Sequence, residues 1–156
     1  MYNIILLSLL INLSFSCSPT PRWEPSTTQE QVKHAGAVVI GKVTTVETNN
    51  TNYISTITLE ETVFYKGCGP KQITVTGFTD SAACGVDVPS KNSEIVVYVC
   101  RDKDKGIWKL NEINIHAGAA VVNTTVIEQL KEYTENEDSC GECGLMYADC
   151  TKPETS

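Results

Sequence analysis

Cys17 carries the most distinctive chemistry in this 156-residue chain, because it directly follows a sequence typical of signal-peptide cleavage. An apolar run from Ile4 to Leu13 comes first, and small residues stand three and one positions before the predicted cut, at Ser14 and Ser16. Cleavage after Ser16 leaves Cys17 with a free α-amine. That amine and the carbonyl oxygen of Cys17 are two neighbouring donors, which together can chelate a metal ion held by another protein.

Residues 1–16 are therefore predicted to be a signal peptide, and the mature chain is expected to be secreted to the extracellular space or matrix. The apolar run is too short to span a bilayer, and no later stretch is long and apolar enough, so no membrane span is expected. A bacterial lipoprotein, with Cys17 lipidated, is disfavoured because Ser14 stands where that signal has leucine.

All seven cysteines lie from Cys17 onward, as in disulfide-stapled secreted domains. The odd number leaves one thiol free or bonded to another chain. Cys68 and Cys100 each follow or end a predicted strand and can pair with each other. One further pair is expected among Cys140, Cys143 and Cys150. A structural zinc site built from these three cysteines and His116 is the disfavoured alternative.

The composition argues against several classes of function. The net charge of −7 comes without any basic block, which argues against nucleic acid as a partner. His34 and His116 lack a nucleophile motif, and neither a zinc-protease motif nor a phosphate loop is present. We therefore expect no enzyme and no cofactor of its own. Two sequons predict glycans at Asn49 and Asn123.

Alternating apolar residues predict five β-strands, over residues 37–47, 53–65, 72–78, 94–100 and 107–115. A short helix is expected over residues 29–35, capped by Ser26 or Thr27. A second helix is expected after Gly118, with Thr125 and Glu128 as its capping box. Five strands with closely spaced turns favour a mainly β fold, a small closed barrel, over a two-sheet sandwich.

Five stretches, in this order, carry a family resemblance. They are Cys17-Ser18 at the mature start, AVVIGKV (37–43), VFYKG (63–67), SAACG (81–85) and CGEC (140–143). Together they resemble the netrin-like domain, and within it the N-terminal inhibitory domain of the tissue inhibitors of metalloproteinases. The resemblance implies one domain over residues 17–143, followed by a short polar tail over 144–156.

The resemblance also implies a fold and a mechanism. The fold is a five-stranded OB-fold (Greek-key) barrel with a short N-terminal helix and a C-terminal helix. A disulfide between Cys17 and Cys84 pins the N-terminal arm beside the SAACG loop. The two form an inhibitory wedge, made of Cys17, Ser18, Pro19 and Thr20 and of Ala82, Ala83, Cys84 and Gly85. Cys17 then chelates the catalytic zinc of the target protease, and Ser18 enters its specificity pocket.

The sequence departs from the family at Pro19, where a second cysteine is usual. The expected partners are extracellular zinc metalloproteinases, with extracellular matrix proteins as a second class. The alternative function is a non-inhibitory netrin-like binding module or matrix component. A small carrier with a ligand in the barrel mouth is disfavoured, because barrels of few strands are filled by their own side chains.

Overall fold

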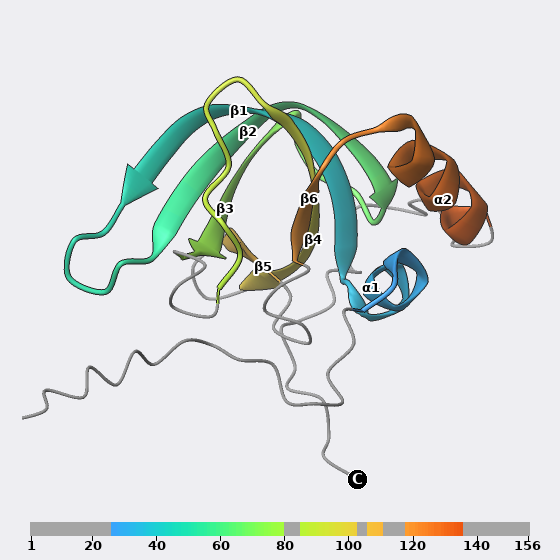
Figure 1. Cartoon of the computed structure of the whole chain (residues 1–156), viewed down its shortest axis with the longest axis horizontal. Helices are drawn as coiled ribbons and strands as arrows, with labels where there is room; N and C mark the ends of the chain where they lie inside the picture. The colour runs from blue at the N-terminus through green and yellow to red at the C-terminus, as the bar shows by residue number, and fades with distance from the viewer. Residues whose placement is uncertain (1–25, 80–84, 103–105, 111–117, 136–156) are drawn as a thin grey trace, which may run out of the picture.

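Six strands and two helices form the part of the chain that the structure describes, a computed structural model of residues 26–79, 85–102, 106–110 and 118–135 (Figure 1). The strands are β1 (Ala37–Thr48), β2 (Ser55–Lys66), β3 (Gln72–Phe78), β4 (Glu94–Asp102), β5 (Ile107–Leu110) and β6 (Ala119–Val121). The helices are α1 (Thr28–His34) and α2 (Thr124–Thr134). All five predicted strands and both predicted helices are present, whereas β6 was not predicted. The fifth predicted strand extended to residue 115, but residues 111–117 lie outside the described part.

The strands close into a barrel of the OB-fold type. Their order is β1-β2-β3-β5-β4, and β4 pairs back onto β1. Every pairing is antiparallel except the short parallel contact of β3 with β5, at Val75 with Trp108 and Thr76 with Lys109. The prediction of a closed barrel rather than a two-sheet sandwich is confirmed. β6 pairs with β4 at Ile95, Val96 and Val97, beside the stretch that β5 occupies.

The barrel interior is filled by side chains of this chain, as small barrels require. In β3, Ile73 and Val75 are buried while Thr74 is exposed, as the alternation predicted. The remaining interior positions come from every strand of the barrel and are almost entirely aliphatic or aromatic. The fully buried ones include Val39, Val43, Ile57, Leu59, Phe78, Val97 and Val99.

A second apolar cluster lies outside the barrel, under the two helices. The outer faces of β1 and β4 supply Val38, Ile40, Val96 and Tyr98. The helices cover them with Val32, Ala35 and Leu130, and Val126, Ile127 and Tyr133 pack around the edge. The apolar stripe predicted for the second helix therefore packs on the outside of the barrel. In Figure 1, α2 lies beside α1.

The predicted cap is confirmed for α1 but not for α2. Thr27 caps α1 and forms a capping box with Glu30, which confirms the predicted start. The capping box predicted at Thr125 and Glu128 is wrong, because Asn123 caps α2 by accepting a 2.9 Å hydrogen bond from the Val126 amide. Asn123 is still extended after β6 (φ −144°), as a capping residue must be, whereas Thr125 already lies inside the helix.

Candidate functional site

The barrel holds the base of the loop that carries Cys84. Phe78, the last residue of β3, forms an isolated parallel bridge with Val86. The Thr79 amide donates a 3.0 Å hydrogen bond to the Val86 carbonyl oxygen. The predicted wedge residues Ala82, Ala83 and Cys84 lie outside the described part, but the two stems of their loop are joined at the end of β3.

Of the predicted wedge residues, Gly85 is the one that lies in the described part. It has no room for a side chain. A Cβ built on Gly85 would overlap the Thr79 hydroxyl oxygen and lie 2.7 Å from Thr79 Cβ. The Thr79 hydroxyl is itself buried and has no hydrogen-bond partner among the described residues. The close approach of the two stems thus explains why glycine follows Cys84, and it identifies Thr79 as a site residue that the sequence did not reveal.

The VFYKG stretch, which contributed to the resemblance, attaches α1 to the barrel. At the end of β2, the Lys66 ammonium donates a 2.9 Å hydrogen bond to the Val32 carbonyl and a weaker one of 3.4 Å to that of Lys33. These carbonyls end α1 and have no partner within the helix, so a cation is favourable there. Gly67 adopts a left-handed conformation (φ 72°) that glycine tolerates best.

α1 follows the predicted N-terminal arm, and it is also held by α2 and β4. The Thr28 hydroxyl donates a 2.9 Å hydrogen bond to Gln129 Oε1 of α2. Burial raises the pKa of Tyr98 above its ordinary value of 10.0, and a side-chain hydrogen bond with Thr28 lowers it in part. The arm residues Cys17, Ser18, Pro19 and Thr20 lie outside the described part, which begins at Ser26, one residue before the cap of this fixed helix.

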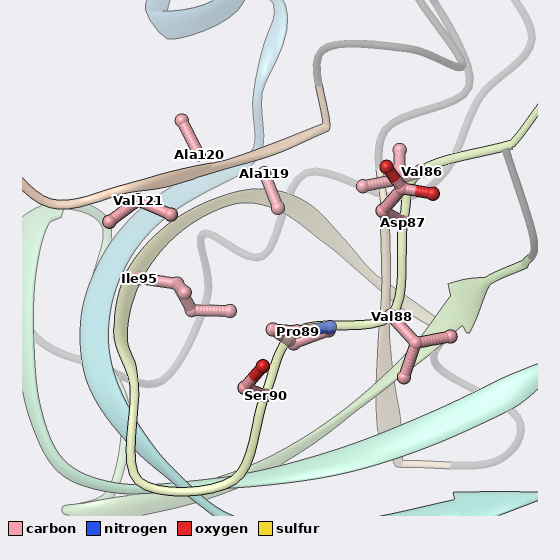
Figure 2. A pocket seen from close by; sticks show the side chains of 9 residues that line it. All are labelled: Val86, Asp87, Val88, Pro89, Ser90, Ile95, Ala119, Ala120 and Val121. Carbon is pink, nitrogen blue, oxygen red and sulfur yellow. The ribbon is translucent and has the colours of Figure 1, made fainter.

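A groove begins one residue after Gly85. Its volume is about 410 Å³, and residues 86–90 line one side while Ile95 of β4 and residues 119–121 of β6 line the other (Figure 2). In Figure 2 the side chains of Ile95, Pro89 and Ala119 point into the space between the two walls. The sequence analysis missed this groove, because residues 86–90 and 119–121 lie far apart in the sequence and neither stretch carries a motif.

Cys68 and Cys100 are both disulfide-bonded, and the described part contains no free cysteine. Lys66 and Tyr98 both pair with Val38 of β1. β1 therefore separates Lys66 and Tyr98 by two strand spacings, about 10 Å. Cys68 and Cys100 each come two residues later in the chain. Cys68 lies past the end of β2, after the left-handed Gly67, so this register does not fix its distance from Cys100. The Cys68–Cys100 pair stays a prediction. Three other cysteines, Cys140, Cys143 and Cys150, lie outside the described part.

The two predicted glycan acceptors are exposed. The Asn49 side-chain oxygen accepts a 2.8 Å hydrogen bond from the Thr51 amide in the turn between β1 and β2. The Asn123 oxygen caps α2. In both residues the side-chain nitrogen, the atom that would carry a glycan, makes no hydrogen bond in the described structure, so neither role conflicts with glycosylation.

Within the described ranges, no cluster of three or more His, Cys, Asp or Glu side chains could hold a metal ion. His116, the proposed fourth zinc ligand beside Cys140, Cys143 and Cys150, lies outside those ranges. No helix in the described part is long and apolar enough to cross a bilayer.

No protein-family model matches the chain, and no curated protein sequence matches it significantly.

Proposed function

We propose that this chain is a secreted inhibitor of zinc metalloproteinases that occludes the active site of its target. In this proposal the mature chain begins at Cys17, whose α-amine and carbonyl oxygen bind the target's catalytic zinc in place of the nucleophilic water. Ser18 enters the specificity pocket, Pro19 and Thr20 continue the arm, and residues 82–85 form the second edge of the wedge. The zinc belongs to the target, and the chain brings no cofactor of its own.

The observation that carries the proposal is the rigid base of the 80–84 loop. An inhibitor that acts by shape must present its contact loop in one conformation, since ordering a flexible loop on binding costs affinity. The Phe78–Val86 bridge, the Thr79 hydrogen bond and the glycine-only contact at Gly85 restrict both stems. They hold the two stems, residues 78–79 and 85–86, against each other, as a preorganised contact loop would require.

The fixed position of α1 supports the other half of the wedge. Eight residues lie between Cys17 and Ser26, and an extended chain over these nine residue steps spans at most about 30 Å. Pro19, Pro21 and Pro25 stiffen this segment by restricting their φ angles. A disulfide from Cys17 to Cys84 would join the arm to the 80–84 loop, and it remains part of the proposal.

The first test is peptide mapping of the secreted protein by mass spectrometry without reduction. The proposal requires a mature chain that starts at Cys17 with an unmodified amine and a cross-linked peptide that contains Cys17 and Cys84. The same map tests the predicted cross-link between Cys68 and Cys100. A chain that begins elsewhere, or Cys17 bonded to a C-terminal cysteine, would remove the chelating wedge.

The second test is titration of a panel of soluble zinc metalloproteinases with the secreted protein, with cleavage of a fluorogenic peptide as the readout. We expect stoichiometric inhibition of at least one enzyme. A variant with one additional alanine before Cys17 keeps every cysteine but displaces the amine, and it should bind at least about 100-fold more weakly, a loss of about 2.7 kcal/mol. The matched control carries the same alanine after Ser156 and should inhibit normally.

Equal inhibition by both extended proteins would contradict zinc chelation by Cys17. Absence of inhibition across the panel, with the fold intact, would favour the alternative, a non-inhibitory extracellular binding module or matrix component. The open groove beside the loop is the observation that favours this alternative.

A further inference from the structure

The outer edge of β6 presents unpaired main-chain groups. Tyr98 donates to the carbonyl oxygen of Gly118 at 2.9 Å, and Val122 donates to that of Glu94 at 3.2 Å. In an antiparallel ladder every second residue points its main-chain groups at the partner strand, so the residues at 118, 120 and 122 face β4. The amides and carbonyls of Ala119 and Val121 therefore face away from β4. Among the described hydrogen bonds, none uses these groups.

This edge faces the groove rather than another strand. β5 pairs with β4 only from Val99 to Asp102, so it covers only one end of this edge of β4. At the other end, residues 86–90 stand across the groove of about 410 Å³ from β6 (Figure 2). Among the described strands, none therefore pairs with the outer edge of β6.

The β6 wall of the groove is apolar, whereas the opposite wall also carries Asp87 and Ser90. β6 is a short edge strand of three residues, but it carries no lysine, proline or bulge. Natural edges carry lysine, proline or a bulge, which discourage pairing with another strand. Residues 118–122 are Gly-Ala-Ala-Val-Val. Val121 is 70% exposed and Val88 across the groove is 37% exposed, and both are among the four exposed large hydrophobic residues of the described part.

We propose that this groove binds an extended polypeptide segment of a partner protein, which adds to β6 as a strand. The main-chain groups of Ala119 and Val121 would pair with its backbone, and its alternate side chains would lie against Val121, Val88 and Ile95. Strand addition of this kind is a common mode of peptide recognition. The proposal does not depend on protease inhibition, since the groove uses neither Cys17 nor the zinc of a protease.

The groove wall formed by residues 86–90, opposite β6, favours the binding of a single extended segment over pairing with a second copy of this chain. A second copy could reach β6 only by bringing its own barrel and its own residues 86–90 against that wall. One extended segment needs only the spacing between two hydrogen-bonded strands, about 5 Å. β-branched or other apolar residues at alternate positions suit both the groove lining and an extended conformation.

The experiment uses the ¹⁵N-labelled secreted protein and the pentapeptide acetyl-TVTVT-amide as the probe, followed by nuclear magnetic resonance. We expect amide shifts confined to residues 86–90 and 118–122, together with slower hydrogen exchange at Ala119 and Val121. The same peptide with all its internal amides N-methylated should bind about tenfold more weakly, because it cannot donate main-chain hydrogen bonds.

A test variant and a matched control distinguish binding in the groove from nonspecific adsorption of the probe. Val121→Lys places a charge on the edge of β6, and at 70% exposure the native side chain contributes little to folding. It should weaken probe binding about tenfold. Tyr53→Lys changes an equally exposed residue (71%) in the turn between β1 and β2 and should leave binding unchanged.

Three results would overturn the proposal. The first is the absence of shifts in residues 86–90 and 118–122 at millimolar probe. The second is equal binding by the N-methylated peptide, which would mean apolar adsorption rather than strand addition. The third is a concentration-dependent dimer in sedimentation that Val121→Lys dissociates, which would assign the edge to a second copy. Each result leaves the inhibition assay unaffected, so the two proposals can fail separately.

Discussion

The Thr79 hydroxyl oxygen occupies the space that a side chain on residue 85 would need. These two residues are the stems of the 80–84 loop, and the Thr79 amide also bonds to Val86. The contact links a local feature of the sequence, glycine after Cys84, to the packing of two chain segments that meet only in the folded barrel.

Gly85→Ala should therefore destabilise the protein by about 1–3 kcal/mol, the usual cost of inserting a methyl group into a filled space. The measurement is the free energy of unfolding from urea denaturation. Thr79→Gly removes the overlapping atoms, so the double variant should be less destabilised than the sum of the two single variants. Additive losses would mean that the two stems do not share this contact.

Lys66→Met should loosen α1, because it removes the ammonium that donates to the Val32 and Lys33 carbonyls. Lys66 is only partly buried, so we expect a loss of about 1 kcal/mol, below the range for buried charged hydrogen bonds. Lys42→Met is the control, since Lys42 is exposed on β1 and its side chain makes no hydrogen bond in the described structure. Equal effects of the two changes on the unfolding midpoint would contradict the capping role.

Gln31→Met should stabilise the protein. Gln31 is 3% exposed, and neither its side-chain oxygen nor its nitrogen has a hydrogen-bond partner within the part of the chain that the structure describes. Burying an unpaired amide costs about 1–3 kcal/mol, and methionine has a similar shape without that cost. We expect a gain of about 1 kcal/mol, measured by thermal unfolding.

Gln29→Met is the matched control for Gln31→Met, because Gln29 lies on the exposed side of the same helix. It should change the free energy of unfolding by less than about 0.5 kcal/mol. A loss of stability in Gln31→Met would show that the amide has a partner in solution, such as an ordered water molecule.

The ionisation of Tyr98 should make the fold sensitive to alkaline pH. Burial raises the pKa of Tyr98 above 10.0, so the folded state binds this proton more tightly than the unfolded state. The resulting stability is complete below about pH 10 and is lost as the pH rises through the pKa of the folded state. Unfolding measured between pH 8 and 12 should show this decline.

Tyr98→Phe should remove the part of that decline that belongs to Tyr98. The variant also loses the Thr28 hydrogen bond, so its stability at pH 8 should fall slightly while its alkaline slope becomes shallower. Tyr53→Phe is the control, because the Tyr53 side chain is 71% exposed. An unchanged slope in Tyr98→Phe would assign the alkaline transition to other groups.

The local pattern of the sequence was sufficient for most elements. β3 runs from Gln72 to Phe78 as predicted, because each side chain's burial follows from its position in a two-residue repeat. The Thr27 cap of α1 was also predictable, since a capping box uses residues only three apart. The closed barrel was inferred from the number and spacing of such strands.

Features that depend on distant segments were decided only by the tertiary structure. β6 lacks an alternating pattern and becomes a strand because β4 offers it a free edge, and where β6 ends determines that Asn123 rather than Thr125 caps α2. The Thr79–Gly85 contact and the groove require β3, β4 and β6 to meet. Short-range periodicity specifies which face of an element is buried, whereas strand order and barrel closure specify which edges are left open.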